Sequence, residues 1–286
     1  CVVIGGAGND VITGSASDNG DNLSGNNGND TFNFADGALT VADTVAGGLG
    51  TDTLTLTNDA TVVDADFTNF TSVEAIASGN NALTLTLGAQ AAESGLATVT
   101  NGTADDSTTV GAGFTNDLTI ALSTGDDTVA AAAYTGDLTV TADIDSITAA
   151  DTLTGNGTSS NLTITLSGGD AALTAAELAA VTGFTTFTAG TDDDTDITLS
   201  DNNTNDAANG SLTVDARALT TTALTFSAAA EDDSNITVLA GGTGDHTVTL
   251  GAGNDTYTST STGNDTVTAT AGNNTISTGG GADVIT

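Results

Sequence analysis

The sequence contains almost no positive charge. Arg217 is the single lysine or arginine, against 37 aspartate and glutamate residues in a chain of 286, and the formal net charge is −36. Nucleic acid and anionic membrane surfaces repel a chain this acidic, so neither is expected as a partner. The same self-repulsion disfavours a compact state unless cations neutralise the carboxylates that folding brings together. We therefore expect folding to depend on bound cations.

Cysteine and histidine, which take part in many catalytic and metal sites, are also scarce. One cysteine, Cys1, excludes an intramolecular disulfide framework and a cysteine-rich zinc site. One histidine, His246, excludes the H-E-x-x-H motif of zinc proteases and leaves no Ser/His or Cys/His arrangement to assemble. Carboxylate pairs carry no information in so acidic a chain, and aromatic residues at 3% disfavour a sugar cleft. We expect a protein without catalytic activity.

A buried core is nevertheless expected, because apolar residues make up 38% of the chain and recur with the period of β-strands. Proline, methionine and tryptophan are absent, so the core must be built from Val, Ile, Leu, Ala and a few Phe. Narrow coils suit that inventory better than a bulky globular core. No apolar run is long enough to span a bilayer, and direct membrane insertion is not expected.

Glycine and aspartate recur in a fixed pattern near both ends of the chain. Residues 5–13 and 250–258 fit the nonapeptide G-G-x-G-x-D-x-U-x, in which U is a large apolar residue, and an isolated copy covers residues 47–55. The glycines allow positive φ, the aspartate presents a carboxylate at a turn, and U points into a core. The copies are in phase, because successive U positions within each end of the chain lie about one nonapeptide apart. The U positions are Ile12, Leu23 and Phe32 near the start, Leu54 in the isolated copy, and Val248, Tyr257, Val267, Ile276 and Ile285 near the end.

These motifs resemble the repeats-in-toxin (RTX) family of secreted, calcium-binding bacterial proteins. The resemblance covers roughly residues 5–55 and 241–286, and the stretch between is similar to the Thr- and Ala-rich body of RTX-type surface-layer proteins and large adhesins. It implies an all-β fold, a right-handed parallel β-solenoid or β-roll, with several bound Ca²⁺ ions. It also implies a secreted or cell-surface protein that is exported by a type I route.

We expect one continuous solenoid with three parts: RTX-like repeats at 1–55, an irregular Thr-rich body at 56–240, and RTX-like repeats at 241–286. Alternation of apolar residues with Thr or Ser predicts body strands at 83–87, 118–122, 138–140, 162–166, 197–199, 212–214, 224–226 and 236–238. A capping box, Thr174 with Glu177, predicts a short helix at 174–182, and a weaker candidate helix spans Ala89 to Glu93. Phe67, Phe70 and Ile76 are expected in the core.

Calcium requires six to eight oxygens at about 2.3 to 2.6 Å, and two nonapeptides per coil would place motifs on one edge about every 18 residues. Carboxylates of one coil could then face carbonyls of the next, across a strand spacing of roughly 4.8 Å. The expected same-edge pairs are Asp10 with Asp30, Asp245 with Asp265, Asp255 with Asn274, and Asp265 with Asp283. The candidate calcium-site residues are Gly6, Gly8, Asp10, Asp21, Gly28, Asp30, Gly48, Gly50, Asp52, Gly244, Asp245, Gly251, Gly253, Asp255, Gly263, Asp265, Asn274, Gly281 and Asp283.

Three of these positions depart from the motif. His246 fills an aspartate position and the carboxylate moves to Asp245, which disfavours or alters that site because calcium prefers oxygen ligands. Asn274 replaces an aspartate and should weaken its site, and an insertion makes the geometry at Asp21 uncertain. The acidic runs at 192–194 and 231–233 are expected on a solvated surface, whereas the half-motif at 125–129 is left open.

Two functions are compatible with these features. The first is a calcium-dependent extracellular structural protein that self-associates into a surface layer or filament, with itself as the main partner and cell-surface polysaccharide as a second. The second is a calcium-binding stalk or carrier, a fragment of a larger secreted adhesin, toxin or exoenzyme. The apolar segments at 2–4 and 284–286 show no polar cap, which favours stacking of copies but equally fits a piece cut from a longer array.

Overall fold

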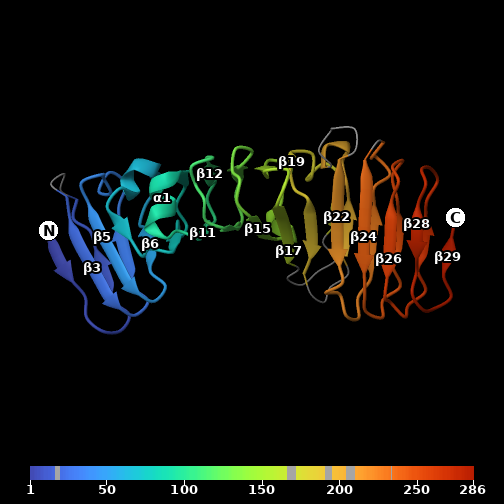
Figure 1. Cartoon of the computed structure of the whole chain (residues 1–286), viewed down its shortest axis with the longest axis horizontal. Helices are drawn as coiled ribbons and strands as arrows, with labels where there is room; N and C mark the ends of the chain where they lie inside the picture. The colour runs from blue at the N-terminus through green and yellow to red at the C-terminus, as the bar shows by residue number, and fades with distance from the viewer. Residues whose placement is uncertain (17–19, 166–171, 191–194, 204–209, 233) are drawn as a thin grey trace. The chain divides into compact units, whose positions relative to one another are not determined.

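A computed structural model describes residues 1–16, 20–165, 172–190, 195–203, 210–232 and 234–286 (Figure 1). Contacts between Cα atoms divide the chain into two compact units, Cys1–Thr139 and Val140–Thr286. Each unit consists of short strands that pair in parallel, coil upon coil, so each is a parallel β-solenoid. The expected fold class is confirmed.

Unit 1, residues 1–139, contains three runs of parallel strands. One sheet has the order β1-β3-β5-β8, and the other runs have the orders β2-β4-β6-β9-β11-β13 and β7-β10-β12-β14. The bounds are β1 Val2–Ile4, β2 Val11–Thr13, β3 Asn22–Asn27, β4 Thr31–Phe34, β5 Thr44–Leu49, β6 Thr53–Leu56, β7 Ala60–Val62, β8 Phe70–Thr71, β9 Ala75–Ala77, β10 Leu83–Leu87, β11 Thr98–Thr100, β12 Ser107–Val110, β13 Leu118–Ala121 and β14 Thr128–Ala130, with the 3-10 helix η1 at Asp64–Phe67 and α1 at Ala89–Ser94.

Unit 2, residues 140–286, repeats the scheme. One sheet has the order β18-β21-β23-β25-β27-β29, and a second run has the order β17-β20-β22-β24-β26-β28. Strand β15 (Leu138–Asp143) contains the boundary between the units. The other bounds are η2 Ile144–Ser146, β16 Thr152–Thr154, β17 Ser160–Thr165, β18 Ala172–Leu173, β19 Val181–Thr182, β20 Thr186–Ala189, β21 Thr195–Thr198, η3 Asp201–Asn203, β22 Ser211–Ala216, β23 Leu224–Ser227, β24 Asn235–Ala240, β25 Thr247–Thr249, β26 Thr256–Ser259, β27 Thr266–Thr268, β28 Thr275–Ser277 and β29 Val284–Ile285.

The register of the C-terminal coils shows two nonapeptides per coil. Thr247 pairs with Thr266 and Thr266 with Val284, whereas Thr256, one nonapeptide further on, pairs with Thr275 in the other sheet. Motifs on one edge therefore recur after a full coil, as the sequence predicts.

Apolar residues alternate along the strands and point into the coils. The U positions Ile12, Leu23, Phe32, Leu54, Val248, Tyr257 and Val267 are buried, whereas Ile285 in the outermost strand is 54% exposed. Phe67, Phe70 and Ile76 lie in the core as expected, and the two phenyl rings meet edge to face at 5.4 Å. The eight body strands predicted from Thr alternation are all present, within a few residues of their expected bounds.

The helix predicted at 174–182 is wrong. Residues 175–180 form turns, Thr174 and Glu177 bond to each other within them, and the chain then enters β19, where Val181 pairs with Leu153 of β16. Strand pairing takes the residues that would have completed the helix. The α-helix of the described chain is instead the weaker candidate, α1.

An acidic side chain from another coil caps this helix. Asp64 of η1 accepts hydrogen bonds from the backbone N–H groups of Gly88, Gln90 and Ala91. Gly95 ends the helix in the left-handed region, with a φ of 99°. Within the described residues, no helix is long and apolar enough to cross a bilayer.

Candidate metal centre

The motif aspartates of unit 1 stand in a column along one edge of the solenoid. The backbone N–H of Asp10 donates to Oδ1 of Asp30 at 2.8 Å, and that of Asp30 donates to Oδ1 of Asp52 at 2.7 Å. The N–H of Asp52 donates to Oε2 of Glu74 at 2.8 Å. Each carboxylate therefore accepts from the equivalent residue one coil earlier. We call this arrangement the aspartate ladder.

Unit 2 has the same ladder on two edges. The N–H of Ile236 donates to Asp255 at 2.8 Å, and the N–H of Asp255 donates to Oδ1 of Asn274 at 2.8 Å. On the other edge the N–H of Asp265 donates to Oδ1 of Asp283 at 2.9 Å. Three of the four expected same-edge pairs are thus joined directly, coil to coil.

A second ladder runs in the opposite direction, through the residue that precedes each aspartate. Oδ1 of Asn9 accepts from the N–H of Asn29 at 2.9 Å, and Oδ1 of Asn29 accepts from the N–H of Thr51 at 3.0 Å. The same bond links Asn254 to Asn273 at 2.8 Å. We call this the asparagine ladder. The turn of each coil is therefore bonded to the turns before and after it.

At three positions of the aspartate ladder, the second carboxylate oxygen accepts no hydrogen bond within the described residues. Oδ2 of Asp30, Asp52 and Asp255 is buried and has no hydrogen-bond partner among the described residues. Burial raises the pKa of the Asp52 and Asp255 carboxyls, and the neighbouring charges of Asp30 and Glu74 raise that of Asp52 further. A buried carboxylate oxygen without a donor is costly unless a cation meets it. These oxygens fit a metal ion.

The first glycine of each N-terminal motif makes room for this carboxylate. A Cβ on Gly5 would lie 2.6 Å from Oδ2 of Asp10 and 2.8 Å from the carbonyl oxygen of Gly25. At Gly25 and Gly47 a Cβ would likewise collide with Oδ2 of the motif's own aspartate, Asp30 or Asp52. Each of the three therefore borders a space lined by a carboxylate and by carbonyl oxygens of the next coil.

The third glycine of each motif is needed for a different reason. Gly8, Gly28 and Gly50 have positive φ, and a Cβ on Gly28 or Gly50 would strike the carbonyl of the equivalent glycine one coil earlier. Gly253 and Gly263 do not have positive φ. At these two positions a side chain is excluded only because a Cβ would collide with a backbone carbonyl of the preceding coil. The expected role of positive φ therefore holds for the N-terminal motifs and for Gly281, but not for every candidate glycine.

The carboxylates and backbone carbonyls of these turns offer only oxygen atoms as metal ligands. Calcium binds oxygen ligands. Within the described residues no three acidic, histidine or cysteine side chains form one cluster. An ion here would accordingly be held by the carboxylates of Asp10, Asp30, Asp52 or Asp255 together with backbone carbonyls such as that of Gly25.

His246 takes an aspartate's place in the ladder. Its ring is fully buried, Nδ1 accepts the N–H of Leu224 at 3.0 Å, and Nε2 lies 2.9 Å from the carbonyl oxygen of Gly241. Nδ1 therefore carries no proton, and the ring is neutral. The backbone N–H of His246 donates to Oδ1 of Asp265 at 3.1 Å. The histidine preserves the coil-to-coil bond without supplying a ligand for calcium.

Three candidate aspartates are placed differently from expectation. Asp245 is exposed, and it accepts the N–H of Asn264 at 2.6 Å, so it belongs to the asparagine ladder. Asp265 is buried, with its oxygens bonded to His246 and, at 2.8 Å, to the hydroxyl of Tyr257. Asp21 is buried and accepts from the N–H and hydroxyl of Ser15. Asp21 and Asp265 have both carboxylate oxygens engaged and therefore less free capacity for an ion than Asp30, Asp52 and Asp255.

Sequence reasoning missed several rungs. Glu74 continues the N-terminal ladder outside any motif, and the N–H of Asp106 donates to Asp127 of the half-motif at 2.9 Å. Gly125, two residues earlier, has a φ of 137°, as a motif glycine does. The lone glycine of Gly125-Asp126-Asp127 was the available signal. No local signal identifies Glu74, because its partner lies a coil away.

The expectation of a solvated run at 231–233 is wrong for Glu231, which is buried and accepts the N–H of Ser234 at 3.2 Å. Burial follows from its place at the turn that enters β24. Asp232 is exposed as expected. Asp233 and the run Asp192–Asp194 lie outside the described residues.

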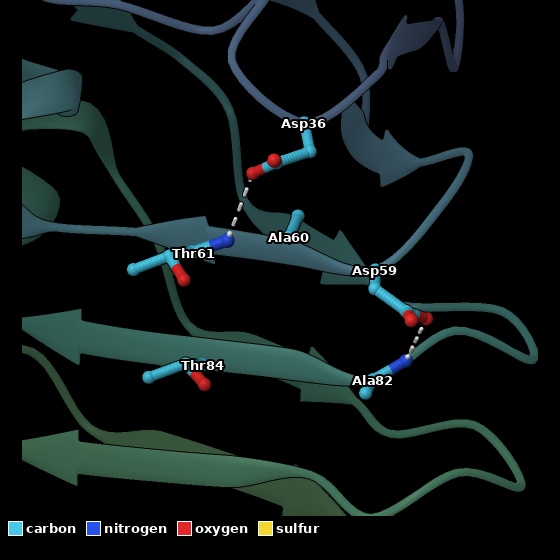
Figure 2. Close-up of a pocket in the computed structure, with 6 residues that line it drawn as sticks. All are labelled: Asp36, Asp59, Ala60, Thr61, Ala82 and Thr84. Atoms are coloured by element: carbon cyan, nitrogen blue, oxygen red, sulfur yellow. Dashed lines mark hydrogen bonds between the residues drawn. The ribbon is translucent and has the colours of Figure 1, made fainter.

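A separate pocket of about 270 Å³ lies on the surface of unit 1 and is lined by Asp36, Asp59, Ala60, Thr61, Ala82 and Thr84 (Figure 2). Asp36 accepts the N–H of Thr61 at 3.4 Å, and Asp59 accepts that of Ala82 at 3.0 Å. Both carboxylates are exposed and serve neighbouring backbone groups, unlike the buried oxygens of the ladder.

Comparison with known proteins identifies the repeats. The RTX calcium-binding nonapeptide repeat matches the chain in four copies, at residues 2–19, 42–57, 233–261 and 259–286. No curated protein and no solved structure matched the chain. RTX repeats bind calcium and occur in secreted proteins. Two of the four copies contain an unpartnered carboxylate oxygen, that of Asp52 and that of Asp255. The chain therefore carries the calcium-binding repeats of the RTX family.

Proposed function

We propose that this chain is a calcium-dependent structural protein of the cell exterior, in which bound ions complete the turns of a β-solenoid. The observation that carries the proposal is the buried, unpartnered carboxylate oxygen on each of Asp30 and Asp52 in unit 1 and Asp255 in unit 2. Calcium would supply what the described residues do not, a positive partner for each oxygen.

Charge gives calcium control over folding. Stacking the coils concentrates carboxylates in columns, in a chain whose net charge is −36 and whose single Arg217 cannot offset them. Metal binding to sites that exist only in the folded state adds its free energy to folding. The protein would then remain unfolded inside the cell, where free calcium is low, and fold after export by a type I route.

Circular dichroism tests this proposal. The chain should be largely unfolded in excess EDTA and should gain β-signal cooperatively as calcium is added. Magnesium should substitute poorly, because it requires a tighter octahedral shell and dehydrates reluctantly. A full β-spectrum in EDTA would refute the proposal.

We further propose that copies associate end to end. Strands β1 and β29 are outermost in their sheets, and their apolar side chains are exposed: Val2 at 71%, Ile4 at 70%, Val284 at 52% and Ile285 at 54%. An outer strand offers unpaired backbone groups to another strand, and contact between two different surfaces yields a filament or lattice.

Deletion of residues 278–286 provides the test. It should abolish assembly in calcium while leaving most of the calcium-induced β-signal. If the chain without the deletion sediments as a monomer at high concentration with calcium, the alternative is favoured, a stalk or carrier that presents other parts of a larger protein. No catalytic role is proposed in either case.

A further inference from the structure

Unit 2 presents a face made mostly of hydroxyl side chains. The outward residues of β20, β22, β24, β26 and β28 pair in register, so that Thr186, Thr213, Thr237, Thr256 and Thr275 form one continuous file. Neighbouring strands are roughly 4.8 Å apart, so the file is a regular array. We call the outward residues of these five strands and of β17 the threonine face.

The threonine face has no net charge. Its described outward residues include one carboxylate, Asp215 of β22, which lies between Thr188 and Leu239 of the adjacent strands. Arg217 pairs with it, Nε at 2.9 Å from Oδ1 and a terminal nitrogen at 2.6 Å from Oδ2. The single basic side chain of the chain thus neutralises the single acid of this face.

The opposite sheet of unit 2 shows the contrast. Its outward residues are also mostly Thr and Ser, but they include Asp196 of β21, which pairs with Thr225 of β23. No basic side chain remains for Asp196, because Arg217 is the only one in the sequence. Two sheets of similar composition therefore differ in charge, and the difference rests on one arginine.

We propose that the threonine face is the surface on which a second copy of this chain packs side by side. A partner with a net charge of −36 is repelled by acidic surfaces, so close approach requires a neutral face on both molecules. A second copy also presents the same strand repeat, so hydroxyl groups of the two arrays can meet in register. This contact rests on the proposed self-association and adds a lateral interface to the end-to-end one.

The charge balance of the face gives a sharp test. In calcium, Arg217→Gln exposes Asp215 on both copies and should weaken lateral association at least about tenfold, as measured by sedimentation velocity over a concentration series. The double variant Asp215→Asn/Arg217→Gln is neutral again and should regain association. Circular dichroism in calcium confirms that both variants fold.

A matched pair of charge insertions locates the contact. Thr256→Asp places an acid on the threonine face, and Thr247→Asp places one on the opposite sheet of the same unit. Only Thr256→Asp should weaken association. Equal sedimentation of Arg217→Gln and the unaltered chain, or equal loss from the two threonine variants, would overturn the lateral interface.

The end-to-end contact fails or survives independently. If deletion of 278–286 abolishes assembly but Arg217→Gln does not, the end-to-end contact stands and the lateral one is refuted. If the reverse holds, the lateral contact stands alone. A chain that stays monomeric in calcium yet is retained on a neutral polysaccharide column, with retention lost in Thr256→Asp, would reassign the face to glycan and refute self-packing.

Discussion

At the scale of single residues, the ladder position has two separable requirements. The backbone of the preceding coil needs an acceptor, whereas an ion needs a negative charge. Asp255 meets both, but Asn274 and His246 meet only the first, since each accepts a backbone N–H and neither carries charge. Substitutions among these residue types can therefore change calcium binding without breaking the solenoid.

Asp255→Asn separates the two requirements. The amide oxygen can still accept the N–H of Ile236, as Asn274 does for Asp255, but the charge of the unpartnered oxygen is lost. Calcium affinity at this turn should fall at least about tenfold, because ligand charge sets the affinity of such sites. The β-content of calcium-free protein should not decrease, since an unpaired buried charge has been removed.

Isothermal titration with calcium is the measurement, and Asp232→Asn, at an exposed residue of the same unit, is the control. Indistinguishable titrations for the two variants would show that Asp255 holds no ion.

At the scale of the coil, adjacent glycines of one turn have unequal roles. A Cβ on Gly5 enters the space beside Asp10 and the Gly25 carbonyl, whereas the nearest atom to a Cβ on Gly6 is Oδ2 of Asp10 at 3.9 Å. Gly5→Ala should therefore raise the calcium concentration needed for folding, and Gly6→Ala should be close to neutral. A calcium titration followed by circular dichroism compares them, and equal midpoints would contradict the assignment of the space to an ion.

The strands and turns of the solenoid were predictable because their signals are local. Each nonapeptide contains its own glycines, acceptor and apolar residue, so its phase fixes the coil register. The cap of the helix and the rung at Glu74 were not predictable. Asp64 caps α1 from another coil, and Glu74 reaches Asp52 only because the intervening chain closes one turn. The capping box at Thr174 was overridden when Val181 paired with β16. Which carboxylate oxygens remain unpartnered is likewise decided by contacts between coils.

At the scale of the whole molecule, columns of acid make stability depend on pH in opposite ways with and without calcium. The pKa of Asp52 is raised by burial and by Asp30 and Glu74, so the folded state binds its proton more tightly than the unfolded chain does. Stability without calcium is then greatest at low pH and falls as pH rises from the ordinary carboxyl pKa through the raised one. With calcium the order reverses, because the ion needs the deprotonated form.

Calcium-free protein should gain β-signal as pH falls from neutral towards the ordinary carboxyl pKa, whereas the calcium-loaded protein should lose affinity for the ion over the same interval. Circular dichroism and calcium titration at each pH measure the two effects. Asp52→Asn should flatten the calcium-free response, and an unchanged response would assign it to other carboxyls.

Both ladders join equivalent positions in consecutive coils. A unit can therefore lose or gain a whole coil and keep the same bonds between neighbouring coils. Thr247 pairs with Thr266 and Thr256 with Thr275, so excision of residues 247–265 would bring Thr266 opposite Thr225 and Asn274 to the place of Asp255. Every donor would still face an acceptor. A gene encoding such a chain can lose or duplicate a coil by recombination between its own repeats, and the product would differ in reach while keeping the same surface. Spans of different length are then available from one sequence without the invention of a new contact.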